Sequence, residues 1–128
     1  MKSGAQALYD ELFRMIQGFA KTYTVNPPEG VSMPFVQMGA SQMVPIPNKT
    51  SFISSVYQVI DVWGLGADRK AVSDLASQVL EAAYKLKSSP EGYRFNLDLD
   101  TASCEMMIDN STNEDLWRAR LSLKFSVC

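Results

Sequence analysis

The chain has 128 residues, of which 46% are hydrophobic and 20% charged, and its formal net charge is −2. This composition predicts a single domain over residues 1–128 and excludes disordered, collagen-like and coiled-coil chains, while the mild acidity excludes a strongly basic footprint for nucleic-acid binding. The absence of histidine and the presence of only two cysteines exclude histidine-based catalysis, histidine-ligated zinc, a histidine pH switch and, within one chain, a four-cysteine zinc site or a disulfide scaffold.

The first half of the chain is predicted to form one helix and two strands. Apolar residues at helical spacing over 4–23 predict a helix with Ser3 as its N-cap, and the β-branched residues at 22–25 are expected to fray its end. After the Pro-Pro loop, the apolar run at 35–40 predicts a strand. Residues 41–51 contain Pro45, Pro47 and Asn48 and are predicted to be a loop.

The segment 52–63 is rich in β-branched and aromatic residues and gives the strongest strand prediction. Neither of its faces is cleanly polar. Such a strand lies between two layers or packs on another chain, and a domain this small has few layers to offer. Candidate residues for a subunit or partner interface are therefore the apolar side chains of this strand and of the preceding loop: Met43, Val44, Ile46, Tyr57, Val59 and Trp63.

The second half is predicted to form one helix and three strands. Two glycines at 64 and 66 break the preceding strand, and Asp68 is a good N-cap for a helix that runs to about Lys87. Alternating residues at 93–100, 103–108 and 117–127 predict three strands, with a turn at 109–113. The order α-β-β-α-β-β-β predicts an α+β fold, in which an antiparallel sheet of about four to five strands has two helices packed on one face.

Several motifs have both a functional and a structural interpretation. The glycines before Asp68 could form a phosphate-binding turn, but a simple strand-to-helix turn is favoured because the remaining fingerprint residues are missing. Four carboxylates could bind a divalent cation or could simply face water: Asp98, Asp100, Glu105 and Asp109. A basic row could meet phosphates, could pair with carboxylates such as Asp98 and Asp100, or could be a solvated face: Arg118, Arg120 and Lys124. These three basic residues and the two aspartates form a candidate charged face or lumen, and no residue is assigned to catalysis, a cofactor or a metal.

The sulfur-containing residues are expected to be structural. Cys104 alternates with core positions and is predicted to be a buried, unreactive thiol, whereas the terminal Cys128 is predicted to be exposed. Methionines near the predicted loop and the late hairpin either fill the core or adapt to a contact surface of an oligomer.

The sequence indicates no targeting or membrane-spanning segment. No signal peptide is indicated at the N-terminus, and no apolar run is long enough to cross a membrane. The default expectation is a cytosolic protein without membrane partners.

The order of motifs resembles a known family. The Pro-Pro loop leads to a Pro-Phe-Val strand, and a Pro-Asn-Lys-Thr segment at 47–50 precedes a second strand. That strand ends in Val62-Trp63 and continues directly into the glycine-punctuated helix start at 64–68, and the chain closes on a long alternating strand. Over nearly its whole length, this pattern resembles the tail completion or tail terminator (head–tail joining) proteins of long-tailed bacteriophages.

The resemblance implies a structural role without catalysis or cofactor. Proteins of this kind assemble as a ring, usually a hexamer, on the last ring of the tail tube. They stop tube polymerisation and give a docking surface for the filled head, so that the implied partners are the tail-tube protein, a head–tail connector protein and DNA in transit through the lumen. The implied location is the tail or neck of the virion, after assembly in the host cytoplasm.

Three alternatives stay open. The first is a head-side neck or head-completion protein, since both kinds of protein need a ring and a lumen. The second is a small cytosolic α+β module that binds a ligand or regulates a partner, which predicts a deep pocket with convergent polar groups. A metal-dependent enzyme built on the carboxylates is a remote third option.

Overall fold

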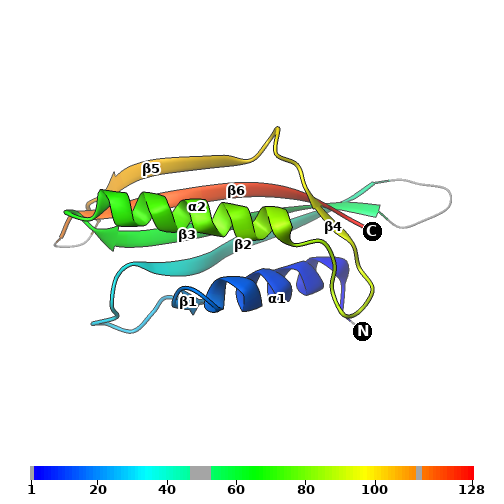
Figure 1. Cartoon of the computed structure of the whole chain (residues 1–128), viewed down its shortest axis with the longest axis horizontal. Coiled ribbons are helices and arrows are strands. Elements are labelled where there is room, and N and C mark those ends of the chain that lie inside the picture. The colour runs from blue at the N-terminus through cyan, green and yellow to red at the C-terminus, as the bar shows by residue number, and fades with distance from the viewer. Residues whose placement is uncertain (1, 47–52, 112–113) are drawn as a thin grey trace.

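The computed structural model describes residues 2–46, 53–111 and 114–128. Over these residues the chain forms two helices and a six-stranded sheet (Figure 1). In chain order, the elements are α1 (Gly4–Gln17), β1 (Thr22–Tyr23), β2 (Phe35–Ile46), β3 (Ile53–Leu65), α2 (Arg69–Lys85), β4 (Phe95–Leu97), β5 (Ser103–Asp109) and β6 (Leu116–Val127). The predicted α+β fold with two helices packed on one face of the sheet is confirmed.

The sheet is mixed, and in this it differs from the antiparallel sheet that the sequence predicted. Its strands lie in the order β1-β2-β3-β6-β4, and β5 pairs with β6 on the same side as β4. All neighbours are antiparallel except β1, which runs parallel to β2 with Thr22 beside Val36. The predicted helix ends earlier than expected, at Gln17, and Thr22 and Tyr23, which the sequence assigned to its frayed end, form an added strand.

The second correction concerns the predicted loop at 41–51. Its first part, Ser41–Ile46, continues β2 and pairs with β3, after a bulge between Met38 and Ser41. Pro45 is tolerated there because no described strand pairs with the outer side of this part of β2, and an edge strand can lack an N–H on its free side. The rest of the predicted loop, 47–51, and the strand position Phe52 lie outside the described residues.

Both predicted helix starts lie where the sequence placed them, but only the first is capped by a side-chain hydrogen bond. The side-chain oxygen of Ser3 accepts a hydrogen bond from the N–H of Gln6 at 3.1 Å, as an N-cap should. Asp68 stands at the N-cap position of α2, but its side chain makes no capping hydrogen bond. Gly64 does not break the strand as predicted but lies within β3, close to α2, where a Cβ would lie 2.2 Å from Cγ2 of Val72. The strand-to-helix turn follows at Gly66 and Ala67.

The core lies between the helices and the sheet. Most strand side chains that face the helices are apolar and buried, and they alternate with residues on the opposite face, as period-two patterning requires. From the sheet the core takes Val36, Met38, Val56, Ile60, Val62, Ala119, Leu121, Leu123, Phe125 and Val127, and from the helices chiefly Leu8, Leu12, Ile16, Val72, Val79 and Ala83. Among the described residues, no helix is both long and apolar enough to cross a membrane.

Candidate interaction surface on the open face of the sheet

The face of the sheet that points away from the helices, here called the open face, carries most of the residues that the sequence singled out. Residues paired across antiparallel strands share a face, so the registers assign the side chains to it. Across β2, β3, β6 and β5 the open face contains Gln37, Gln42, Val44, Ile46, Ser55, Tyr57, Val59, Asp61, Trp63, Arg118, Arg120, Ser122, Lys124, Glu105, Met107 and Asp109.

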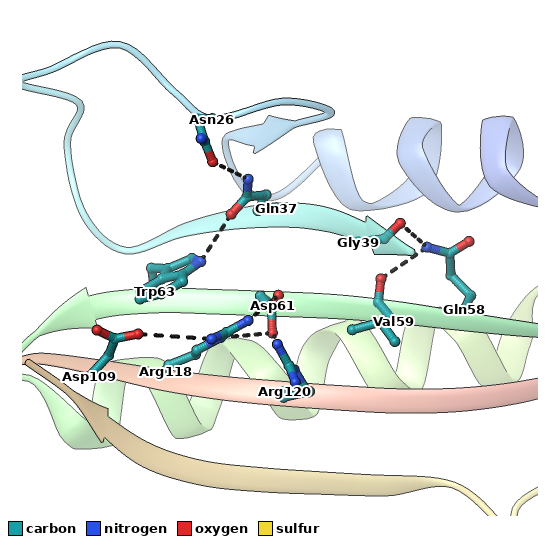
Figure 2. Close-up of polar contacts among 10 residues, drawn as sticks. All are labelled: Asn26, Gln37, Gly39, Gln58, Val59, Asp61, Trp63, Asp109, Arg118 and Arg120. Atoms are coloured by element: carbon teal, nitrogen blue, oxygen red, sulfur yellow. Dashed lines mark hydrogen bonds and ion pairs between the residues drawn. The ribbon is translucent and has the colours of Figure 1, made fainter. Parts of the chain in front are cut away.

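A buried carboxylate organises the centre of the open face (Figure 2). Asp61 is only 6% exposed. It accepts hydrogen bonds from Nε and Nη2 of Arg118 at 3.2 and 3.1 Å, and from Nε of Arg120 at 3.4 Å. The arginines of β6 thus pair with β3, and not with Asp98 and Asp100 as one interpretation of the sequence suggested.

An aromatic side chain extends this cluster toward β2. The guanidinium carbon of Arg118 lies 4.8 Å from the centre of the Trp63 ring, within cation–π range. The indole Nε1 of Trp63 donates to Oε1 of Gln37 at 3.2 Å, and Nε2 of Gln37 donates to Oδ1 of Asn26 at 3.0 Å (Figure 2). The loop after β1 is therefore tied to the open face through this chain of contacts.

Asp109 closes the cluster on the β5 side. Its Oδ1 accepts the hydroxyl and the N–H of Ser111 at 2.5 and 2.9 Å, and its Oδ2 lies 3.8 Å from Nη1 of Arg118. These hydrogen bonds, followed by the nearby arginine charge, lower the pKa of Asp109. The cluster as a whole holds two carboxylates and two guanidinium groups, so its charges are balanced.

The other half of the open face is apolar. Val44, Ile46 and Tyr57 are each about 40% exposed, and Val59 is half-buried. Lys124 lies with its Nζ 5.8 Å from the centre of the Tyr57 ring. Met43 is equally exposed, but it pairs with Val56 and so points to the helix side of the sheet. Of the six candidate interface residues, the structure therefore brings five onto one face.

The two remaining acidic candidates lie at the margin of this face. Oδ1 of Asp98 accepts the N–H of Asp100 at 3.1 Å in the turn after β4. Both line a shallow hollow together with Lys124 of β6. Among the described residues, no group of three or more acidic or cysteine side chains is placed to hold a metal ion.

Cys104 is exposed, so the prediction of a buried thiol is wrong. It lies on β5, which pairs with β6 at the margin of the sheet beyond the cover of the helices. Partial burial still raises the pKa of Cys104, so the thiol stays protonated at neutral pH. Cys128 is exposed, as predicted.

The sequence interpretation missed two buried polar residues of β3, one on each face of the sheet. In the sequence, Asp61 is one of several polar residues in a mostly apolar strand. Because a buried carboxylate is costly unless it is paired, an aspartate in a buried strand indicates a charged partner on a neighbouring strand. Gln58 lies on the helix side and is 1% exposed. Its amide Nε2 donates to the carbonyl oxygens of Gly39 and Val59 at 3.1 and 2.9 Å, which fixes the bulge of β2 (Figure 2).

No family model matches this chain, and the search of curated proteins finds no match. The comparison with solved structures finds a similar fold in a chain of the virion of a native gene transfer agent particle. The two chains are 19% identical with a TM-score of 0.63, and the match covers 96% of this chain and 92% of that one. The similarity thus spans the whole fold rather than a part of it.

Proposed function

We propose that this chain is a structural virion protein that forms a ring, caps the tail tube as a tail terminator and provides the docking surface for the head. The observation that carries the proposal is the shared fold over nearly the full length of both chains, since the other chain belongs to a virion. The order of motifs in the sequence resembles tail terminators independently of that comparison. The virion is accordingly the proposed location.

The open face is compatible with a lumen through which DNA passes. A conduit must not hold phosphates tightly, because each bound phosphate slows passage. Arg118 and Arg120 are already paired with Asp61, and Asp109 lies beside Arg118, so these arginines are partly neutralised before DNA arrives. Lys124 is the third basic residue of the row. Among the described contacts, it has no such carboxylate partner. DNA contacts in the lumen are proposed to be transient and non-specific.

Genetic removal with electron microscopy tests the proposal. In the genome that encodes this chain, deleting its gene should leave filled heads without tails and tail tubes of uncontrolled length. Expression of the intact chain in trans should restore joined particles, in which mass spectrometry detects the protein. If purified wild-type particles lack the protein, the proposal is overturned.

The same experiment separates the alternatives. Loss of a head-side neck protein would leave unjoined tails of normal length, whereas loss of a cytosolic ligand-binding module would leave joined particles. In the joined particles, the proposed partners of this chain are the tail-tube protein on one side of the ring and a head–tail connector protein on the other. The proposed ring is a homo-oligomer, with a hexamer as the expected stoichiometry.

A further inference from the structure

Both margins of the sheet have backbone groups that no other described strand pairs with. β1 covers β2 only at Val36 and Gln37, which leaves the outer side of Ser41–Ile46 unpaired within the described chain. On the opposite margin, β5 pairs with β6 alone over Ser103–Asp109. Natural edge strands are usually protected by charged side chains, especially lysine, by proline, by a bulge or by a covering element. The β5 edge has neither lysine nor proline, and the β2 edge has a single proline, Pro45.

We propose that the outer edge of β2 (Ser41–Ile46) in one copy pairs with the outer edge of β5 (Ser103–Asp109) in the next, so that the sheet continues from subunit to subunit. This inference names the subunit contact of the ring and so rests on the proposed function. The strands β2, β3, β6 and β5 alternate in direction, because each pair is antiparallel. Adding the next copy after β5 keeps the alternation, and all copies then show the same face to the same side, as a ring requires.

The lengths of the two edges select one register. Only one antiparallel alignment pairs all six residues of the β2 edge with β5 while keeping helix-side residues opposite helix-side residues. In that register the helix side has Ser41 opposite Ile108, Met43 opposite Met106 and Pro45 opposite Cys104, and the open face has Gln42 opposite Met107, Val44 opposite Glu105 and Ile46 opposite Ser103.

The position of the two edges fits a closed sheet. The free part of β2 lies level with the end of β6 near Phe125, whereas β5 lies level with the start of β6 near Ala119. Joining the edges therefore shifts each copy by about six residues, or about 20 Å, along the strand direction. The four strands of each copy are about 19 Å wide, so the strands tilt by about 45°, which is close to the tilt found in closed barrels.

The chemistry of the two edges favours this pairing over self-pairing. The β2 edge has no ionisable side chain, and it exposes Met43, Val44 and Ile46. The β5 edge exposes Ile108 but also contains Glu105 and Asp109. Pairing β5 with β5 would gather the acidic groups of two copies in one seam, whereas pairing β5 with β2 adds no like charge. Pro45 lacks an N–H, so the seam is limited to a short ladder that becomes strong only when a ring closes.

The direction in which such a ring curves follows from the relative bulk of the helix layer and the sheet. The helices are the bulkier layer, so they belong on the outside, and the open face then lines the lumen. This places the charge-balanced cluster of Asp61, Asp109, Arg118 and Arg120 toward the channel.

Disulfide trapping tests the seam. In a Cys104→Ser, Cys128→Ser background, the pair Met43→Cys with Met106→Cys places thiols directly opposite each other across the seam. The matched control is Val44→Cys with Met106→Cys, because residues 43 and 44 point to opposite faces of β2. After mild oxidation with diamide at high protein concentration, the first variant should give a ladder of covalent dimers and larger species on denaturing gels, and the control should not. Circular dichroism and a cooperative urea transition establish that both variants fold.

Other outcomes overturn the seam. If Met43→Cys alone or Met106→Cys alone cross-links as efficiently as the pair, the contact is a symmetric dimer. If the pair gives no ladder, the seam is wrong; sedimentation then shows whether rings form through another surface, which would leave the proposed function standing. Conversely, a ladder from a protein that is absent from virions would support the seam and overturn the proposed function.

Discussion

Gln58 is the residue on which the shape of β2 depends. The bulge between Met38 and Ser41 removes regular pairing, and the carbonyl oxygen of Gly39 needs another donor. Gln58 supplies it through Nε2, while its Oε1 accepts the hydroxyl of Ser41. At Gly39 itself, a Cβ would lie 3.0 Å from the carbonyl oxygen of Val59, so a larger residue would press on the neighbouring strand.

Replacing Gln58 with leucine should lower the free energy of unfolding by about 2 kcal/mol, because buried partners lose their hydrogen bonds while the volume is kept. Urea denaturation measures this change. Gln42→Leu is the matched control, since Gln42 is exposed on the adjacent strand and its substitution should change stability little. An equal effect of the two substitutions would show that Gln58 does not hold the bulge.

Replacing Asp61 with asparagine should also lower the free energy of unfolding by about 2 kcal/mol, because two guanidinium groups at the open face lose their carboxylate. The effect is smaller than for a fully buried pair, since Arg120 is partly exposed to water. Asp100→Asn, at an exposed turn, should leave the urea midpoint nearly unchanged. A stable Asp61→Asn protein would mean that the arginines find other partners.

Replacing Trp63 with alanine should cost about 2–3 kcal/mol, because a half-buried ring and its contacts with Arg118 and Gln37 are lost. Trp63→Phe should recover most of this loss, since only the indole hydrogen bond, worth about 1 kcal/mol, is missing. Urea denaturation separates the two variants, and sedimentation shows whether assembly changes with stability. Unchanged stability and assembly in Trp63→Ala would exclude a role for this side chain.

At the scale of elements, the helix-facing sides of the strands were the easiest to predict, because buried apolar residues impose their period on the sequence. The alternation of β6 predicted nearly its whole length. Ser41–Ile46 was not predicted as a strand, because Pro45 and the Pro47-Asn48 pair that follows this segment are typical of a loop. What makes it a strand is pairing with β3, which local sequence does not encode.

Replacing Met43, Val44 and Ile46 together with alanine should impair assembly more than monomer stability. Each side chain is about 40% exposed, so truncation should cost well under the 2–5 kcal/mol of a buried site. Sedimentation measures assembly and urea denaturation measures stability. The control is Val25→Ala with Leu99→Ala, which removes exposed apolar groups elsewhere. A large loss of monomer stability would instead place the three residues in the core.

At the scale of the whole molecule, the fold class and the number of helices followed from the sequence, whereas the candidate surface followed only in part. The basic row of β6 was visible, but its partner Asp61 lies 57 residues away along the chain, and only the register of β3 against β6 brings them together. Cys104 was misplaced for a related reason: alternation assigns a face, and the cover above that face depends on where the helices end.

The pH dependence of stability belongs to the same scale. Hydrogen bonds and nearby cations lower the pKa of Asp10, Glu81 and Asp109 in the folded chain. Their stabilisation is present above the unfolded-state pKa of about 4 and is lost as the pH falls through the lower folded values. Since the chain has no histidine, the urea midpoint should be nearly constant between pH 6 and 7.5 and should decrease below about pH 4.5. A midpoint that rises on acidification would contradict this assignment.

The bulge in β2 also changes which residues of the strand face the helices. Before it, even-numbered residues such as Val36 and Met38 face the helices; after it, odd-numbered residues such as Ser41 and Met43 do. Deleting Gly39 or Ala40 would therefore remove the extra residue and restore regular alternation, with Met43 still on the helix side and Val44 still on the open face. Deleting a residue after the bulge, such as Gln42, would instead exchange the faces of the residues beyond it, so single-residue deletions within this regular part of β2 should be less tolerated than substitutions at the same exposed positions.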